Sequence, residues 1–329
     1  MRIGRISVFL RQNWFIAGIL LVILLGLLFS GIGARLNRGS ILGTVFIVTL
    51  FLIAGLKLPL DSIVSGIRNL RLHLFIQLFV FVITPLLFFA ATLPFKSTFD
   101  EPILIGIYAL ACLPTTISSC IIFTQSAEGN VVGAMFNSAL ANLGGVIVTP
   151  LILSLLLQST RHSLPFEELL RILKNLSLKM LLPILVGMLS RRFISNYIDR
   201  HKQPLSTLSN IFILLIVFLS LAQTAEDPTF AGQLSRMTLP FIYLTLLHIL
   251  SLILIYFGSI WIGLGRENLI AAMYTASQKT LAMGVPLLST YFSSHPDILG
   301  LALLPVLFYH PLQLLLAGFL PKIFTRMKE

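Results

Sequence analysis

The sequence predicts an all-α polytopic membrane protein with ten transmembrane helices. Two observations lead to this fold class. Of the 329 residues, 57% are hydrophobic and only 11% are charged, whereas a soluble domain carries about 25% charged residues. The hydrophobic residues are also gathered into runs long enough to cross the roughly 30 Å hydrocarbon core of a bilayer. We therefore expect a multi-pass protein of the cell membrane, with the bacterial inner membrane as its location.

Ten hydrophobic segments follow one another along the chain. The first follows a basic N-terminus, and we interpret it as a transmembrane helix because no small-residue cleavage site and polar mature domain come after it. One segment, 176–191, is short, and another, 130–157, is long enough to tilt in the bilayer. The ten predicted spans are 14–34, 41–58, 72–93, 103–125, 130–157, 176–191, 206–224, 237–263, 268–291 and 298–320.

Lysine and arginine residues predict the orientation, because basic loops stay on the cytoplasmic side. With both termini inside, 14 of the 23 basic residues fall on inner segments, 8 fall on outer segments, and Lys279 lies within a span. We therefore expect both termini to be cytoplasmic. The formal net charge of +11 suits anionic headgroups, so membrane lipid is a predicted partner and nucleic acid is not.

The ten spans form one membrane domain that divides into two sets of five, 1–157 and 176–320. With an odd number of spans in each set, the two halves have opposite orientations, as in inverted-repeat transporters. The fourth segment of each half is the polar, interrupted one. Between the halves, residues 158–175 carry apolar side chains at helical spacing, which predicts a helical connection at the membrane interface.

The fourth segment is interrupted at mid-span by a proline and a group of hydroxyl residues. Pro114 removes a helix hydrogen bond and clashes with the preceding turn. Backbone left unpaired at membrane depth survives only where protein buries it or where it lines a cavity. Freed carbonyls and hydroxyls at such a place can hold a cation or a polar substrate. The hydroxyl residues are Thr115, Thr116, Ser118 and Ser119.

The ninth segment carries a second polar run at the matching position of the second half. Gly284 and Pro286 follow this run and are predicted helix breakers, like Pro114. Proline kinks and hydroxyl residues also occur as packing features of membrane helices, so either segment alone admits a structural interpretation. Their matching positions favour a binding site. The polar residues of this run are Ser277, Gln278, Lys279 and Thr280.

Lys279 is the most informative single residue. A charge at the bilayer centre costs about 2.5–3.5 kcal/mol on insertion scales, and none of the twelve acidic residues lies at mid-span to neutralise this one. Lys279 is therefore deprotonated, solvated by carbonyls and hydroxyls, or paired with an anion. Its distance from both ends of the span argues against snorkelling, and we expect it to have a functional role.

The fifth segment carries Asn137, Ser138 and Asn142 within two helical turns. These residues either complete a ligand shell beside the broken helices or join helices by hydrogen bonds worth about 0.6 kcal/mol each. We favour binding for Asn137 and Ser138, and both interpretations stay open for Asn142. Weaker candidates, which are more often satisfied buried groups, are His73, Gln77, His310 and Gln313.

No catalytic or cofactor motif is found, so an enzyme is not expected. The sequence lacks the Walker A, HExxH and GxSxG patterns, and Cys112 and Cys120 are too far apart on one helix to form a disulfide. The leading function class is a secondary transporter of an anionic or amphipathic small molecule. The alternative is a non-transporting membrane regulator or assembly partner that kept the fold, and a channel comes after that.

Several motifs around the interrupted segments resemble the bile acid:sodium symporter family, and in particular its sodium/bile acid cotransporter 7-like branch, which has bacterial members. The resemblance covers nearly the whole chain. The motifs are Arg71-Leu-His-Leu-Phe-Ile-Gln77, Leu113-Pro114 with the hydroxyl residues that follow, Gly129-Asn130, Phe136-Asn137-Ser138-Ala139, Val148-Thr149-Pro150-Leu151, Lys279 with Leu281 and Gly284, and Tyr309-His310-Pro311.

This resemblance implies two inverted five-helix repeats, with discontinuous helices 4 and 9 crossing near the midplane between a panel domain and a core domain. It also implies a symporter-like function that couples the uptake of an organic anion to sodium. No other cofactor is implied. The positions matching the sodium ligands of relatives are Gln77, Ser119 with Cys120, Ser138 and Gln278, of which Ser119, Ser138 and Gln278 form the expected sodium site.

Two residues depart from the family pattern. Relatives that bind sodium have a glutamate where this chain has Tyr274, and usually an asparagine where it has Lys279. Our hypothesis is that the lysine replaces one sodium ion, either as a fixed charge or by exchanging a proton. Sodium and the proton therefore both stay open as the coupling ion. Lys279→Asn should alter transport or its pH dependence if the hypothesis holds.

Overall fold

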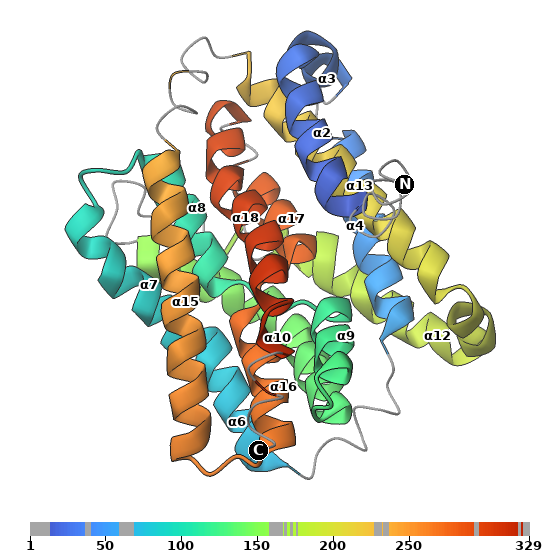
Figure 1. Ribbon diagram of the computed structural model, residues 1–329. Coiled ribbons are helices and arrows are strands. Elements are labelled where there is room, and N and C mark those ends of the chain that lie inside the picture. Colours follow the sequence, from blue (N-terminus) through green and yellow to red (C-terminus); the bar gives the residue numbers. More distant parts are fainter. Residues whose placement is uncertain are drawn as a thin grey trace, which may run out of the picture.

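The computed structural model describes residues 14–36, 41–58, 69–157, 177–226, 237–292 and 296–321, together with the single residues 167, 170, 171, 174, 175, 232 and 324. Within these residues the protein is helical and contains no strand (Figure 1). The predicted connection over 158–175 lies almost entirely outside the described residues. All ten predicted spans coincide with helices, several of them in two or more pieces.

The first half of the chain forms three spans and then the first broken span. A π-helix, η2, interrupts the long third span and widens one turn of it. The helices of this half are α2 (Trp14–Leu28), α3 (Ser30–Leu36), α4 (Ile41–Lys57), α6 (Leu70–Leu78), η2 (Phe79–Ile83), α7 (Thr84–Thr92), η3 (Leu93–Phe95), α8 (Glu101–Cys112), α9 (Ser118–Ser126) and α10 (Val131–Leu157).

The second half also has three spans before its broken span. Its sixth span is longer than predicted: the sequence suggested an end at residue 191, but the helix continues to Arg200 as a polar extension. The helices of this half are η4 (Ser177–Leu181), α12 (Leu182–Arg200), α13 (Lys202–Thr224), α15 (Thr238–Trp261), α16 (Arg266–Ser277), α17 (Leu281–Tyr291) and α18 (Pro296–Ala317).

Among the described residues, five helical stretches are long and apolar enough to cross a membrane. Exposed leucine, isoleucine and phenylalanine side chains surround the molecule, as expected for a surface in contact with lipid. The chain is therefore an integral membrane protein. The five stretches are Leu70–Phe95, Val131–Leu157, Lys202–Thr224, Thr238–Trp261 and Ile298–Ala317.

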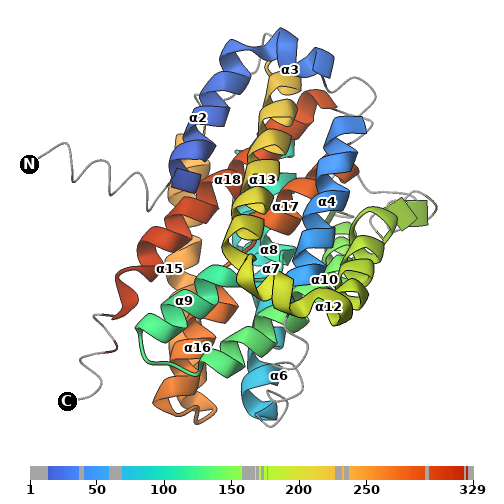
Figure 2. The ribbon, with the colours of Figure 1, turned by 90° about the vertical axis from the view of Figure 1, so that its right-hand side faces the viewer.

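The helices pack into two groups, visible from two directions in Figures 1 and 2. In the first group α12 packs on α4, and α13 packs on α2, α3 and α4. The backbones of α4 and α12 approach each other closely. A Cβ added to Gly55 would lie 2.2 Å from the Ile184 carbonyl oxygen. A Cβ added to Gly187 would lie 2.3 Å from the Leu52 carbonyl oxygen. Glycine is therefore required on both sides of this contact.

The second group contains the two broken spans. Here α8 packs on α18 and α10, while α16 packs on α15, α10, α6 and α9. The two groups meet where α13 contacts α17 and α18. The broken helices thus lie inside the second group, and α8 and α16 are buried along nearly their whole length.

Candidate functional site

Both broken spans are interrupted at mid-length, and the two interruptions touch. α8 ends at Cys112 and α9 begins at Ser118, while α16 ends at Ser277 and α17 begins at Leu281. The backbone N–H of Thr280 donates to the carbonyl oxygen of Pro114 at 3.0 Å. We call residues 113–117 and 278–280 together the crossing. Pro114 lies in the first interruption, where its effect on the helix was predicted.

Gly284 and Pro286 do not lie in the second interruption, so the prediction that they break the helix is wrong. Both are inside α17, and the N–H of Gly284 donates to the Thr280 carbonyl oxygen at 3.2 Å. Pro286 removes only one helical hydrogen bond, and membrane helices tolerate such a loss inside a protein. The interruption falls earlier because other residues satisfy the backbone groups of residues 278–280.

Side chains from the helix that follows each broken span satisfy these freed backbone groups. In the first half, the Thr149 hydroxyl donates to the Cys112 carbonyl oxygen at 2.8 Å and the Asn142 amide donates to the Thr115 carbonyl oxygen at 2.8 Å. These four groups are buried or half-buried, so each would be costly if left unpaired. α10 thereby holds the first interruption open.

The second half contains a matching set. The Tyr309 hydroxyl donates to the Ser277 carbonyl oxygen at 3.4 Å. The Gln313 amide bonds both backbone groups of Lys279, donating to the carbonyl oxygen at 2.7 Å and accepting from the N–H at 2.7 Å. In both halves, therefore, a hydroxyl holds the last residue of the first half-helix and an amide holds the interruption itself.

A cluster of polar side chains forms where Gln278 meets the start of α9. The Gln278 Oε1 atom accepts hydrogen bonds from Thr116 at 2.5 Å and from Ser119 at 2.6 Å, and the two hydroxyls also contact each other. The Cys120 thiol lies 3.5 Å from Oε1 and donates to the Tyr274 carbonyl oxygen. We call Thr116, Ser119, Cys120, Ser138 and Gln278 the Gln278 cluster.

Hydrogen atoms are too few for the contacts in this cluster. Three oxygen atoms form three contacts, but the two hydroxyls supply only two protons. The Gln278 amide nitrogen is buried without a hydrogen-bond partner among the described residues. If the Gln278 side-chain amide were rotated by half a turn, its nitrogen would face the two hydroxyls and supply the missing protons. Oε1 would then be the atom without a partner. The Ser138 hydroxyl also has no partner, although it lies near the Cys120 thiol.

Lys279 points into a different environment, in which backbone carbonyls surround its ammonium group. The Nζ atom donates to the carbonyl oxygens of Ala111 and Leu113 at 2.8 Å each and to that of Val80 at 3.2 Å. The side chain is 2% exposed. These three contacts are the ones expected if backbone carbonyls solvate the Lys279 amine, which is one of the three states that the sequence left open. We call this arrangement the Lys279 clamp.

The position of the clamp explains how a cation is tolerated without a carboxylate. Ala111 belongs to the last turn of α8 and Leu113 follows it, and the carbonyls at a helix C-terminus lack helical partners and carry partial negative charge. Val80 belongs to the π-helix η2. The ammonium has three protons to donate and finds three acceptors, so its hydrogen-bonding capacity is filled.

The backbone explains why adjacent residues face different surroundings. Gln278 and Thr280 have extended conformations, with φ/ψ of −82°/151° and −93°/128°. In an extended chain successive side chains point to opposite sides. Gln278 therefore points toward α9, whereas Lys279 points toward the end of α8.

Other candidates from the sequence lie in a separate polar group on α6 and α10. The Gln77 amide donates to the Asn137 backbone and side-chain oxygens at 3.1 Å each, and the Asn137 amide nitrogen lies 2.9 Å from His73 Nδ1. Among the described residues, no hydrogen bond links Gln77 or Asn137 to the Gln278 cluster. The structure thus places them next to each other rather than around Gln278.

The remaining candidates make local contacts. Ser277 donates to the Met273 carbonyl oxygen of its own helix, and the Thr280 hydroxyl accepts from the Ala282 N–H as the cap of α17. Thr115 contacts Cys120 at 3.1 Å. Ser118 is exposed at the start of α9 and has no hydrogen bond with the described residues. These four residues shape the crossing rather than complete the cluster.

Some residues at the crossing were not candidates from the sequence. Val80 contributes through its carbonyl oxygen, which no side-chain pattern can indicate. Thr149 and Tyr309 lie within motifs that carried the family resemblance, and that was the available signal for their role. Among the described residues no group of three or more His, Cys, Asp or Glu side chains could hold a metal ion. Any ion site here uses hydroxyl, amide and carbonyl oxygens.

Comparisons with known proteins place the chain in a transporter family. The SBF-like CPA transporter family matches residues 13–326. Sodium/bile acid cotransporter 7 of Danio rerio is 32% identical over 324 residues, covering 96% of this chain and 95% of the relative. The protein of the same name in Mus musculus is 30% identical over 316 residues, covering 94% and 92%. Uncharacterized protein PA2026 of Pseudomonas aeruginosa is 28% identical over 285 residues, covering 85% and 83%.

Proposed function

Because the chain belongs to the SBF-like CPA transporter family, we propose that it is a secondary active transporter, symporter-like in mechanism, that moves an organic anion or an amphipathic solute across the membrane. The observation that carries this proposal is the contact between two broken helices, with unpartnered polar atoms of Gln278 and Ser138 beside it. Unwound backbone inside a membrane protein is characteristic of substrate and ion sites in secondary transporters.

Ten membrane spans in two inverted repeats, residues 1–157 and 176–320, fit this function. At each interruption the following helix supplies one hydroxyl and one amide to the freed backbone groups: Thr149 and Asn142 from α10, and Tyr309 and Gln313 from α18. We also propose that the protein lies in a bacterial inner membrane with both termini cytoplasmic, as the distribution of basic residues suggests.

Sodium is one candidate coupling ion, held by Ser119, Ser138 and Gln278. Ser138 carries a buried hydroxyl oxygen without a partner among the described residues, and turning the Gln278 amide end for end would add its oxygen as a second free acceptor. The contacts of Ser119 and Thr116 with Oε1 bring three oxygens together, which is the ligand type that hard cations prefer. Tyr274 is the obstacle, because it supplies a backbone carbonyl and a ring at the place where sodium-binding relatives have a carboxylate.

Lys279 is the second element of the coupling proposal. Its ammonium replaces one coupling ion, either as a fixed charge or by exchanging a proton during the cycle. The filled hydrogen-bonding capacity of the clamp favours the fixed charge. Lys279→Asn separates these alternatives: a fixed charge predicts lost or uncoupled transport at every pH, whereas proton exchange predicts a lost pH dependence. Unchanged transport with an unchanged pH profile would exclude both.

Solute flux in proteoliposomes tests the transport function. The purified protein would be exposed to a panel of organic anions and amphipathic solutes, bile acids among them, under an inward sodium gradient, a pH gradient or neither. Uptake that needs protein and one of the gradients is the expected result. Binding without flux under all three conditions would instead support the alternative function, a non-transporting regulator or assembly partner.

Thermal stability identifies the coupling ion before a substrate is known. Unfolding would be followed in sodium and in choline between pH 6 and 9. A ligand at 100 times its Kd stabilises the folded state by about 2.7 kcal/mol. A rise in the unfolding midpoint that is specific to sodium would support the site at the Gln278 cluster, and its absence would leave the proton as the coupling ion.

A further inference from the structure

The end of α12 forms an arm at the edge of the molecule, which we define as residues 189–202. The helix kinks at Ile194, where φ and ψ are −128° and 22°. Figures 1 and 2 show α12 at the periphery, away from the broken helices. The start of α12 is apolar, whereas the arm carries charged and aromatic side chains. Spanning a membrane does not account for such side chains.

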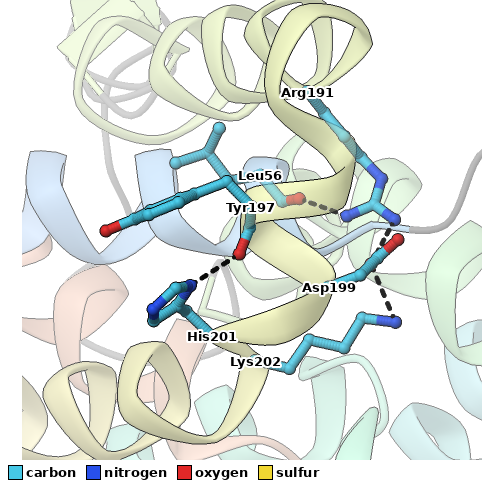
Figure 3. Close-up of polar contacts among 6 residues, drawn as sticks. All are labelled: Leu56, Arg191, Tyr197, Asp199, His201 and Lys202. Atoms are coloured by element: carbon cyan, nitrogen blue, oxygen red, sulfur yellow. Dashed lines mark hydrogen bonds and ion pairs between the residues drawn. The ribbon is translucent and has the colours of Figure 1, made fainter.

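One face of the arm is fixed to the rest of the protein (Figure 3). The Arg191 guanidinium donates to the Leu56 carbonyl oxygen at 2.8 Å and to Asp199 at 2.8 Å. Lys202 also contacts Asp199, at 3.0 Å, and the Ile198 side chain is buried. Leu56 is in the last turn of α4, so the arm is held in place by a buried arginine rather than hanging free.

A second face presents large apolar side chains to the surroundings. Phe193 is 88% exposed and Tyr197, one turn further along, is 61% exposed. Phe193 and Tyr197 lie on the two sides of the kink at Ile194, and Ile194 and Leu189 nearby in the chain are exposed as well. Such an apolar patch has to be covered by something apolar.

Two exposed basic side chains accompany this apolar patch. Arg192 and Arg200 are exposed and have no hydrogen bond or ion pair with the described residues. Asp199 does not neutralise them, because it is engaged by Arg191 and Lys202, whose hydrogen bonds hold the pKa of that carboxyl below its ordinary value. The arm therefore carries two free guanidinium groups next to an aromatic patch.

We propose that the α12 arm lies in the membrane interface and binds the headgroup of an anionic phospholipid. Helices in the membrane interface bind with aromatic side chains among the acyl chains and with arginine side chains reaching the headgroups, and guanidinium groups match phosphate in geometry and charge. Phe193 and Tyr197 insert among the acyl chains while Arg192 and Arg200 contact the phosphate. Arg191 then connects the lipid-bound arm to the end of α4.

A single-tryptophan reporter tests the depth of the arm. Trp14 and Trp261 would be replaced by phenylalanine, and Phe193→Trp introduced in that background. In nanodiscs, quenching by brominated acyl chains and protection from aqueous iodide is the expected result. Quenching by iodide without quenching by the brominated lipid would place the arm in water and overturn the proposal.

Thermal stability against added dioctanoyl phosphatidylglycerol, compared with dioctanoyl phosphatidylcholine, tests the headgroup preference. We expect a shift specific to phosphatidylglycerol, with its half-maximal concentration raised at least about fivefold in Arg192→Gln/Arg200→Gln. The matched control is Arg171→Gln/Lys174→Gln, which removes the same charge from exposed residues elsewhere. Equal effects of the two pairs, or no preference for phosphatidylglycerol in the unmodified protein, would contradict a lipid site on the arm.

Discussion

Gln278 and Lys279 are neighbours in sequence, yet their side chains occupy opposite kinds of environment. The Lys279 clamp pairs three ammonium protons with three carbonyl oxygens and has no capacity left. The Gln278 cluster contains an unpartnered amide nitrogen and an unpartnered Ser138 hydroxyl. Both regions are buried, so the contrast is one of satisfied against unsatisfied polar groups rather than of depth.

This difference separates a structural role from a binding role. A buried polar group without a partner costs about 1–3 kcal/mol, and where several such groups lie together beside unwound backbone they can be satisfied by a ligand. A filled clamp is instead expected to hold its elements in one arrangement, here the ends of α8 and η2 against the second interruption. Substitutions in the clamp should therefore reduce stability, and substitutions in the cluster should reduce ligand response.

The largest effect is expected for Lys279→Met, which keeps the length of the side chain and removes its charge. Three buried carbonyls lose their donor, and relief of the lysine's own desolvation offsets only part of that cost. We expect a destabilisation on the order of 3 kcal/mol, measured by thermal or denaturant unfolding in detergent. The matched control, Lys179→Met in η4, should change stability by less than about 0.5 kcal/mol.

If Lys279→Met were as stable as the control, the clamp would not be a structural element. The lysine would then have to act during the transport cycle alone.

The second effect concerns the residue that holds the Lys279 backbone. Gln313→Leu removes the partner of both the N–H and the carbonyl oxygen of Lys279, and we expect a loss of about 2 kcal/mol. Asn142→Leu is the matched variant in the first half, where the amide bonds the carbonyl oxygens of Thr115 and Ser138. Because Asn142 is half-buried and satisfies no backbone N–H, its loss should be smaller.

Unfolding of both variants side by side measures this difference between the halves. If Asn142→Leu lost more unfolding free energy than Gln313→Leu, the first interruption and not the second would be the more tightly held one.

Sequence reasoning located the helices and the interruptions because both depend on local signals. Hydrophobic runs gave all ten helical segments, and Pro114 with its hydroxyl neighbours indicated the first break. The end of α12 was placed too early because a charged helix extension does not resemble a membrane span. Gly284 and Pro286 misled the prediction of the second break, since a proline is tolerated inside α17.

The partners across the crossing could not be predicted in the same way. The contact of Gln278 with Thr116 joins residues 162 positions apart, and that of Lys279 with Val80 joins residues 199 positions apart. No periodicity carries such information. The sequence did indicate that Lys279 needed solvation by carbonyls, an anion or deprotonation, but the acceptor carbonyls became identifiable only when the ends of α8 and η2 were placed beside it.

A smaller effect is expected for Thr116→Val, which preserves the shape of the side chain. It removes one hydroxyl from the contacts with Gln278 and Ser119, and we expect a loss of about 1 kcal/mol in the absence of sodium. If sodium binds at the Gln278 cluster, the sodium-specific rise in the unfolding midpoint should fall as well. Thr124→Val in the same half-helix is the control, because its buried hydroxyl has no partner and lies outside the cluster. A sodium response that survives Thr116→Val unchanged would place the ion elsewhere.

The smallest effect on stability, and the sharpest test of the comparison, is expected for Ser138→Ala. The Ser138 hydroxyl is fully buried, and its nearest polar neighbour is the weakly bonding Cys120 thiol, so removing it relieves a desolvation cost and breaks at most one weak contact. In choline the variant should be as stable as the unmodified protein or slightly more stable. In sodium it should lose the ion-specific rise in its unfolding midpoint, because the removed oxygen belongs to the proposed ion site. A clear loss of stability in choline would mean that the hydroxyl is satisfied in the folded protein and that the Gln278 cluster, like the Lys279 clamp, is a structural contact.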